Sequence, residues 1–274
     1  IKQRMQYDKQ PCFIVKAEQK NIDEFLSHFS FDLTNAQKEA VNKILKDFQK
    51  KSPMARLLEG DVGSGKTVVA AAAVFAAVKT GYQIAYMAPT EVLARQHFKT
   101  FTEYFKPFGK KIGLITSSEC LKFPSKVSPN KATHISKSQL LKWIASGEIP
   151  ILIGTHSLIQ EKVKFKNLAF VIIDEQHRFG TNQRQKLAKK SVAPHLLSMT
   201  ATPIPRTLAL TVYGDLDLTL LDVMPPLLTE IGLALPFARA PLLAPGKPTA
   251  RLDALCPQCP LWFVHARVSS RGAT

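Results

Sequence analysis

The sequence predicts an α/β domain built around a mostly parallel β-sheet with helices on both faces. Two observations predict it. Short apolar runs alternate with longer stretches whose apolar residues recur every three or four positions, and the apolar runs are continuous rather than interrupted at every second residue. Continuous apolar strands are typical of parallel sheets covered on both faces, since such strands have no solvent side.

The individual elements follow from this pattern. The expected strands lie at residues 55–58, 84–88, 112–115, 151–153, 170–173 and 196–199. The expected helices lie at residues 67–79, 91–105 and 137–146. Residues 122–133 (KFPSKVSPNKAT) are polar and carry proline and serine, so we expect an exposed loop there.

The repeating pattern covers residues 31–226, which we interpret as one domain. Residues 1–30 are expected to be a linker or the remnant of an upstream domain, because a chain that begins with Ile1 suggests a piece of a longer protein. Residues 227–274 contain one lysine, Lys247, and six of the 18 prolines. This tail is either a small extra element or, as we favour, the product of a frame shift or an unrelated junction. We expect it to be irregular and poorly ordered.

The net charge of +16 indicates a polyanionic partner, with nucleic acid first, because lysines gain affinity by neutralising phosphates. A solvated basic surface is the alternative. The composition, 45% hydrophobic and 21% charged, is typical of a globular protein. The longest apolar run, residues 68–78, is too short to span a bilayer, and the N-terminal residues lack the apolar core of a secretory signal. No membrane role is expected.

The four cysteines do not form a disulfide framework in this interpretation. Cys12, Cys120, Cys256 and Cys259 are few and scattered, so we expect no disulfide partner and a reducing, cytoplasmic location. Cys256 and Cys259 form a lone CxxC pair without a second pair, and a zinc site is therefore not expected.

GDVGSGKT, at residues 60–67, fits the phosphate-loop pattern G-x-x-x-x-G-K-[ST]. Glycines let the backbone curl so that its N–H groups point at phosphate oxygens, and the following helix adds its positive end. Lys66 would place a cation on the β- and γ-phosphates, and the Thr67 hydroxyl can ligate Mg²⁺. A glycine-rich turn without a ligand is the alternative, but the flanking strand and helix favour the motif. The expected nucleotide-binding residues here are Gly60, Gly63, Ser64, Gly65, Lys66 and Thr67.

VIIDEQHRFG, at residues 171–180, places an acidic pair directly after an expected strand. The carboxyl ends of parallel strands are where such sheets bind ligands. Asp174 is therefore suited to hold Mg²⁺ directly or through water, and Glu175 to orient or deprotonate an attacking water. Gln176 and His177 are suited to sense a γ-phosphate, although an exposed acidic loop is the alternative. The expected catalytic residues are Lys66, Asp174, Glu175 and His177.

Five motifs in helicase order carry a specific resemblance. They are GDVGSGKT, APTEVLARQHF (residues 88–98), ILIGTHSLIQ (residues 151–160), VIIDEQHRFG and SMTATPIPRTL (residues 198–208). Together they resemble the first motor domain of the RecG family of ATP-dependent DNA helicases, which remodel branched DNA. The resemblance implies a RecA-like phosphate-loop NTPase fold. The similar motor of the transcription-repair coupling factor is the alternative, and DEQH in place of DEEH favours RecG.

The resemblance also implies roles for residues outside the phosphate loop. Gln37, in LTNAQ, matches the element that reads adenine in this family. Thr90, Thr155 and His156 match positions that face the nucleic-acid strand, although threonines there can equally cap helices. Thr200 and Thr202 match the motif that couples the ATP state to the grip on DNA, with a tight turn as the alternative.

The same resemblance implies that such motors hydrolyse ATP between two RecA-like domains, the second of which supplies arginines for the γ-phosphate. The match ends after DVMPP, and 48 residues remain, which are too few for that domain. We therefore expect the chain to bind ATP, Mg²⁺ and branched or forked DNA, but to hydrolyse slowly and not to unwind. A nucleotide-dependent DNA-binding module without helicase activity is the non-enzymatic alternative. A transport ATPase or a small-molecule kinase lacks support, because no transporter signature is present.

Overall fold

The computed structural model describes residue 7 and residues 10–125, 128–160, 162–174, 192–201 and 216–222. The chain divides into two units, Ile1–Ala234 and Leu235–Thr274, and the second unit lies wholly outside the described residues. The expectation of an irregular tail at residues 227–274 therefore stays a prediction. No helix in the described part is long and apolar enough to cross a membrane.

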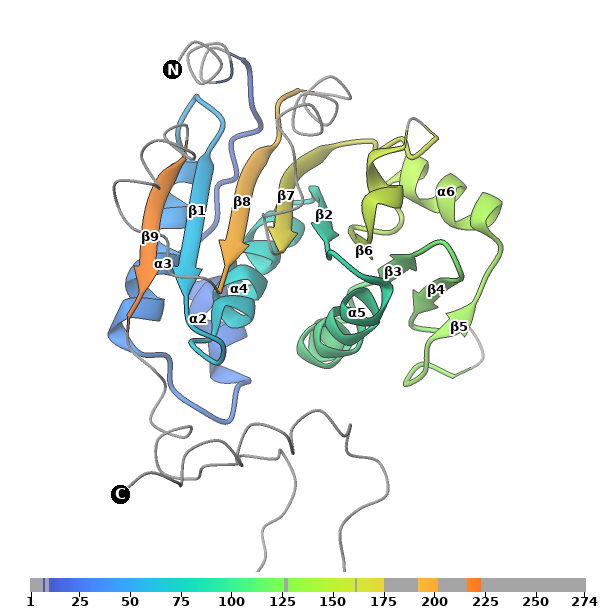
Figure 1. Cartoon of the computed structure of the whole chain (residues 1–274), viewed down its shortest axis with the longest axis horizontal. Coiled ribbons are helices and arrows are strands. Elements are labelled where there is room, and N and C mark those ends of the chain that lie inside the picture. Colours follow the sequence, from blue (N-terminus) through green and yellow to red (C-terminus); the bar gives the residue numbers. More distant parts are fainter. Residues whose placement is uncertain are drawn as a thin grey trace, which may run out of the picture. The chain divides into compact units, whose positions relative to one another are not determined.

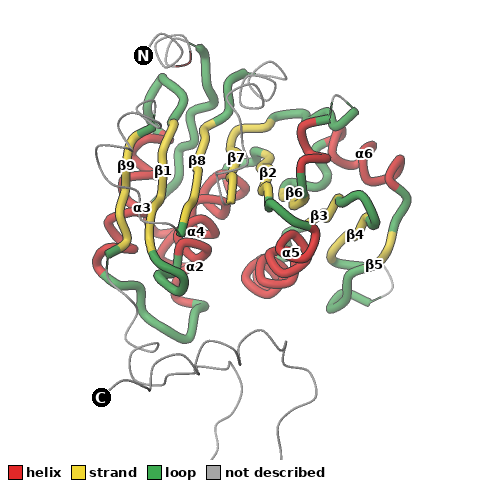
Figure 2. The backbone as a smooth tube through the Cα atoms, viewed as in Figure 1, coloured by secondary structure: helices red, strands yellow, loops and turns green. Residues whose placement is uncertain are grey.

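Nine strands in the described residues form one sheet, in the order β5-β4-β3-β6-β2-β7-β8-β1-β9 (Figures 1 and 2). All neighbours from β3 to β9 are parallel, and β4 and β5 add an antiparallel edge beside β3. The strands are β1 Ala55–Gly60, β2 Gln83–Met87, β3 Ile112–Ile115, β4 Cys120–Phe123, β5 Thr133–His134, β6 Ile151–Gly154, β7 Leu168–Asp174, β8 His195–Thr200 and β9 Asp217–Leu221. The predicted mostly parallel sheet is confirmed.

The expected exposed loop at residues 122–133 is wrong at its two ends, which form part of β4 and β5. Lys122 lies in β4 and is 4% exposed. Its Nζ lies 4.2 Å from the ring centroid of Trp143 and 4.0 Å from a carboxylate oxygen of Glu148. A buried cation needs such partners, and nothing in the local sequence indicates that they are available.

The helices cover both faces of the sheet, as predicted. They are α2 Gln19–Ser27, α3 Asn35–Phe48, α4 Lys66–Lys79, α5 Glu91–Phe105 and α6 Lys137–Ser146, with short 3₁₀ turns η1 Lys106–Phe108 and η2 His156–Ile159. Helices α2 to α5 pack on one face, where strand residues such as Ile84 and Tyr86 point. Helix α6 packs on the opposite face with Ala85 and Met87, the alternate residues of the same strand.

The segment at residues 1–30 was expected to be a linker or the remnant of an upstream domain, and its described part packs on the sheet domain. Helix α2 buries Ile22 and Phe25, and Val15 ahead of it is also buried. The Phe25 ring stacks on Phe75 of α4, with centroids 4.6 Å apart. The packed part of the chain therefore begins before residue 31, the boundary that the sequence pattern suggests. The sequence pattern does not indicate this, because the helix is short and mostly polar and its Phe25 is buried by rings distant in the chain, those of Phe75, Phe105 and Phe108.

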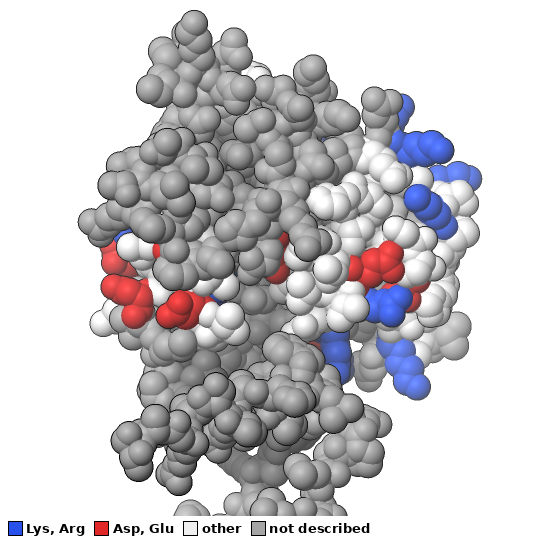
Figure 3. Space-filling model, viewed as in Figure 1, with Lys and Arg blue, Asp and Glu red and all other residues white. Residues whose placement is uncertain are grey.

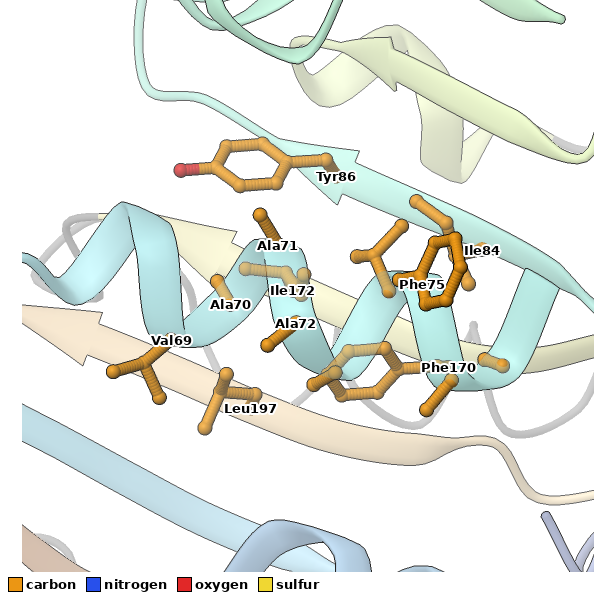
Figure 4. Close-up of a cluster of buried hydrophobic side chains, with 14 of the residues drawn as sticks. Val69, Ala70, Ala71, Ala72, Phe75, Ile84, Tyr86, Phe170, Ile172 and Leu197 are labelled. Atoms are coloured by element: carbon orange, nitrogen blue, oxygen red, sulfur yellow. The ribbon is translucent and has the colours of Figure 1, made fainter. Parts of the chain in front are cut away.

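Helix α4 is buried on all sides. Every residue from Val68 to Val78 is buried, with α2 and α3 on one side and the sheet on the other. Figure 4 shows Ala70, Ala71 and Ala72 facing strand residues that include Ile172 and Leu197. Small side chains let the helix approach the strands closely, and an apolar helix without a polar stripe is stable only when it is enclosed.

His195, at the start of β8, joins three parts of the chain. Its Nδ1 accepts a hydrogen bond from the Met54 backbone N–H at 3.0 Å, and its Nε2 donates to the Phe13 carbonyl at 2.7 Å. This arrangement is that of a neutral imidazole. Burial lowers the pKa of His195 below its ordinary value, against the smaller opposing effects of the Phe13 carbonyl and the Asp47 charge.

The lowered pKa predicts a loss of stability in mild acid. Below pH ~6.5 the unfolded chain protonates His195, whereas the folded chain does so only at lower pH, so the free energy of unfolding falls as the pH drops and then levels off. His195→Phe keeps the ring packing against Phe48 but loses both hydrogen bonds. We expect it to be about 1–3 kcal/mol less stable at neutral pH. Urea unfolding between pH 5 and 8 checks this, and an unchanged pH dependence in the variant would contradict it.

Candidate functional site

The residues singled out in the sequence line one edge of the sheet. Strands β6, β2, β7, β8 and β1 are parallel neighbours in that order, so their carboxyl ends meet at the same edge. Along this edge lie, in the same order, Thr155, Thr90, Asp174, Thr200 and Gly60. The expected nucleic-acid residues thus stand at one end of the row and the phosphate loop at the other.

The phosphate loop connects β1 to α4, as the motif requires. Gly63 and Gly65 have φ angles of +90° and +83°, in the left-handed region that favours glycine. Lys66 begins α4, and its Nζ donates to the carbonyls of Gly60 and Asp61 at 2.5 and 2.9 Å. The ammonium group therefore lies within the curl of the loop, at the positive end of a buried helix. This arrangement suits a phosphate chain.

Gly60 and Ser64 have a packing role that the motif pattern did not indicate. A Cβ at Gly60 would lie 2.6 Å from Ser64 Oγ and 2.9 Å from the Cβ of Leu221, in β9. Ser64 is 1% exposed. Its hydroxyl is turned into the protein, so any contact that Ser64 makes with a phosphate would come from its backbone.

Gln37 was predicted to read adenine, and the structure places its amide under the phosphate loop. The side-chain Nε2 donates to the Ser64 carbonyl at 2.8 Å, and Oε1 accepts from the Thr34 N–H at 2.9 Å as part of the capping box of α3. The residue is 1% exposed. Its amide has capacity for further bonds, and the adenine role stays a prediction. The observed role is to tie the loop to α3.

Asp174, the last residue of β7, has a partner that sequence reasoning missed. Its Oδ2 lies 2.7 Å from Nε2 of His97 in α5, and both side chains are mostly buried, with 14% and 12% exposed. The signal was present in APTEVLARQHF, where a histidine stands one residue before the buried Phe98. Helical spacing alone does not show which strand that histidine faces.

Tyr86 of β2 completes this cluster. Its hydroxyl lies 3.4 Å from both ring nitrogens of His97, and the ring centroids are 4.7 Å apart. Burial raises the pKa of Tyr86 well above its ordinary value, and the neighbouring Asp174 carboxylate adds to the effect through its charge and a hydrogen bond. The phenol therefore stays protonated and can donate to Asp174. The sequence signal for this role was a tyrosine, with its polar hydroxyl, among the apolar residues of a strand expected to be buried.

The expected nucleic-acid residues lie at adjacent strand ends. The Ala88 N–H donates to the Gly154 carbonyl at 2.8 Å, which holds the segments bearing Thr90 and Thr155 together. Thr90 is exposed and caps α5, accepting from the Leu93 N–H at 3.3 Å. Thr155 is 9% exposed, whereas His156 is exposed in η2. Capping by Thr90 is thus observed, and its role toward a strand stays a prediction.

The first turns of α5 are fastened to the turn between β3 and β4. Glu91 accepts from the Ser117 N–H at 3.0 Å and from Ser118 Oγ at 2.6 Å, and the Ser118 bond is the main cause that lowers the pKa of Glu91. Arg95 forms an ion pair with Glu119. Helix α5 therefore touches the carboxyl ends of both β3 and β7.

The expected coupling and catalytic residues are only partly described. Thr200 ends β8, is 1% exposed, and stands in register with Glu59 of β1. It lies between the strand that leads into the phosphate loop and the strand that ends in Asp174. Glu175, His177 and Thr202 lie outside the described residues, so their roles stay predictions.

The donors available for a cation are oxygens. The Thr67 hydroxyl stands in the first turn of α4 and is partly exposed, and the Asp174 carboxylate ends β7. Among the described residues no group of three or more His, Cys, Asp or Glu side chains could hold a metal ion. One hydroxyl and one carboxylate fit Mg²⁺, which commonly takes its remaining ligands from water and phosphates.

Comparison with known proteins decides the family. The model of the DEAD/DEAH box helicase family matches residues 34–211. The chain belongs to the DEAD/DEAH box helicase family. The helicase match spans the whole row of motifs from Gln37 to Thr202.

Relatives of this helicase domain include RecG proteins. The ATP-dependent DNA helicase RecG of Aquifex aeolicus is 47% identical over 227 residues, which cover 82% of this chain and 27% of that protein. RecG of Synechocystis is 49% identical over 205 residues, which cover 75% and 23%. The resemblance to the RecG family is confirmed. The chain spans about a quarter of the length of these relatives.

Solved structures agree with the helicase fold. The structure of RecG bound to a three-way DNA junction has a TM-score of 0.67 and 41% identity, covering 82% of this chain and 28% of that chain. The UvsW helicase from bacteriophage T4 has a TM-score of 0.52 at 16% identity, covering 80% and 71%. The predicted RecA-like fold is confirmed.

The contact between Gln37 and the phosphate loop predicts a specific effect of Gly65→Ala. The left-handed φ alone costs an alanine about 1–2 kcal/mol, and its Cβ would also collide with Gln37 Nε2 and break the bond to Ser64. Gly81→Ala is the matched control, because its φ is +87° and nothing lies within 4 Å of its Cβ. Urea unfolding and titration with a fluorescent ATP analogue should show a larger stability loss, and weaker nucleotide binding, only for Gly65→Ala. Equal losses in the two variants would contradict the contact.

Proposed function

We propose that this chain is an ATP-binding motor domain of RecG type that couples bound ATP·Mg²⁺ to contact with branched or forked DNA. The observation that supports it most is the row of motifs along one sheet edge, with the phosphate loop at one end and Thr90 and Thr155 at the other. The relatives named above are RecG proteins, which favours RecG over a transcription-repair coupling factor. The expected cytoplasmic location stays a prediction.

In the nucleotide half of the site, Lys66 holds the β- and γ-phosphates, and the loop N–H groups at the start of α4 bind their oxygens. Thr67 and Asp174 hold the magnesium ion, which neutralises charge on the phosphates when it is bound. Glu175 orients or deprotonates the attacking water, and His177 senses the γ-phosphate.

In the DNA half, Thr90, Thr155 and His156 contact the phosphates of a strand without reading its sequence. The charge distribution supports this partner. Residues 106–167 contain eleven lysines and three glutamates, a net of +8 and half of the net charge of the chain. Figure 3 shows basic side chains gathered on the side of the domain that carries α6, β4 and β5. That side adjoins β3 and β6 rather than the phosphate loop.

Thr200 and Thr202 couple the two halves. Thr200 ends β8, the strand that separates β1 from β7, so it adjoins both the strand that leads into the loop and the strand that ends in Asp174. A hydroxyl there can exchange hydrogen bonds when the γ-phosphate is lost. The RecG structure named above contains a three-way DNA junction, and we propose DNA of this branched class for the present chain.

Lys66→Ala tests the nucleotide half. Loss of a charge-assisted hydrogen bond of about 1.5–3 kcal/mol predicts binding of a fluorescent ATP analogue weaker by about 10- to 100-fold. Lys79→Ala, at the other end of the same helix and exposed, is the matched control and should bind as the wild type does.

The same preparations, assayed for ATP turnover with and without forked DNA, test the expectation of slow hydrolysis. Vigorous DNA-stimulated turnover that Lys66→Ala abolishes would contradict that expectation and leave the motor assignment in place. Nucleotide binding that is equal in the wild type and Lys66→Ala would contradict the proposed function itself.

Substitutions at Thr90 separate capping from DNA contact. Aspartate is as good an N-cap as threonine, but its charge repels phosphates. We expect Thr90→Asp to keep the thermal stability of the wild type and to weaken binding of forked DNA several-fold, and Thr90→Ser to change neither. Fluorescence anisotropy at two salt concentrations measures this. Unchanged DNA affinity in Thr90→Asp would remove Thr90 from the interface.

A further inference from the structure

The hydrogen bond between His97 and Asp174 joins a helix of the expected DNA half to the carboxylate expected to hold magnesium. A carboxylate oxygen accepts hydrogen bonds, so in this contact His97 Nε2 donates to Asp174 Oδ2 at 2.7 Å. The bond occupies Oδ2 and, together with the hydrogen bond from the Tyr86 hydroxyl, restricts the rotation of the carboxylate about its Cβ–Cγ axis. The partner of an expected magnesium ligand thereby fixes where the other oxygen points.

The Tyr86 ring fixes the position of His97 on the side away from solvent. The Tyr86 ring lies against the imidazole at 4.7 Å between centroids, and Tyr86 also packs edge-on against Phe101, one turn further along α5. Tyr86 is fully buried within β2. A movement of α5 along its axis would therefore shift the imidazole relative to Asp174, because His97 moves with the helix that carries it.

Helix α5 contacts the DNA half at its N-terminal end. Thr90 caps it, and Glu91 and Arg95 are bonded to the turn that follows β3. His97 stands seven residues after Thr90, about 10 Å along the helix. Helix α5 thus connects the strand ends of the expected DNA half with Asp174, the carboxylate expected to hold magnesium.

A purely structural role is the plain alternative. The domain contains such a pair in Arg56 and Asp47, a buried ion pair that also engages Thr219 and joins α3, β1 and β9. That pair involves none of the residues expected to bind nucleotide or DNA. The His97 bond differs because its acceptor is Asp174, the residue at the end of β7 that is expected to hold magnesium.

We propose that His97 is a positioning residue, which orients Asp174 toward the magnesium ion and transmits displacement of the DNA-contacting end of α5 to it. This inference rests on the proposed function. It predicts two separable defects when the bond is lost, one in the magnesium requirement for nucleotide binding and one in the effect of DNA on that binding.

Three substitutions test the role of the donated hydrogen bond. The amide nitrogen of His97→Gln lies near the position of Nε2 and can donate to Asp174. The shorter His97→Asn places its amide near Nδ1 and cannot reach. His97→Leu fills space without donating. Lys99→Ala, an exposed position on the same helix, is the matched control, and thermal unfolding identifies variants that do not fold.

The first measurement is binding of a fluorescent ATP analogue as Mg²⁺ is titrated, without DNA and without turnover. Loss of a hydrogen bond to a metal ligand typically weakens metal binding about 10- to 100-fold. We expect the Mg²⁺ concentration for half-maximal binding to rise about tenfold or more in His97→Leu and His97→Asn. It should stay close to the wild-type value in His97→Gln and Lys99→Ala. If His97→Leu does not fold, His97→Asn decides.

The second measurement repeats the titration with saturating forked DNA. Coupling between two sites is reciprocal and commonly amounts to about 5- to 150-fold in affinity. We expect DNA to tighten nucleotide binding in the wild type and His97→Gln, and not in His97→Asn.

The outcomes separate this inference from the function on which it rests. A merely structural role predicts lower thermal stability with an unchanged Mg²⁺ requirement, and that result would overturn the inference alone. Failure of His97→Gln to restore the wild-type requirement would also overturn it. Nucleotide binding by the wild type that is independent of Mg²⁺ and Lys66 would overturn the proposed function and the inference together.

Discussion

The enclosure of α4 is the constraint on which the rest of the structure depends. All its residues from Val68 to Val78 are buried between the sheet and the outer helices α2 and α3. In a close-packed interior such a helix cannot shift without opening cavities or colliding with its neighbours. Lys66 and Thr67, in its first turn, are therefore held in a fixed position relative to the sheet. The phosphate loop, which leads into this turn, is fixed with them.

The parallel sheet supplies the second constraint, because it brings the ends of many strands to one edge. Two cross-connections then hold the side chains there. Gln37 ties the phosphate loop to the start of α3, and His97 ties Asp174 to α5. One connection runs from a covering helix to the phosphate loop and the other from a covering helix to a strand end. The geometry of the site thus depends on how the helices sit on the sheet as much as on the strands that carry the motifs.

The elements that the sequence predicted well are those with one strong local signal. Six strands were indicated by continuous apolar runs, and α4 and α5 by their length and spacing. The missed elements lack such a signal. Strand β4 contains the buried Lys122, and β9 leaves Leu218 and Leu220 partly exposed. Helix α2 is short and mostly polar, and its Phe25 packs on Phe75 of α4. Their burial depends on partners distant in the chain, which local patterns do not report.

By itself the sequence determined which residues are suited to bind phosphate, magnesium and a nucleic-acid strand, because that prediction depends on residue type and on spacing within single motifs. Only the tertiary structure decided how these residues are partnered. The Gln37 bond to the loop spans 27 residues and the His97 bond to Asp174 spans 77. Packing across the whole sheet decides which helix face meets which strand end. Local sequence patterns do not report such contacts, because the partners are distant in the chain.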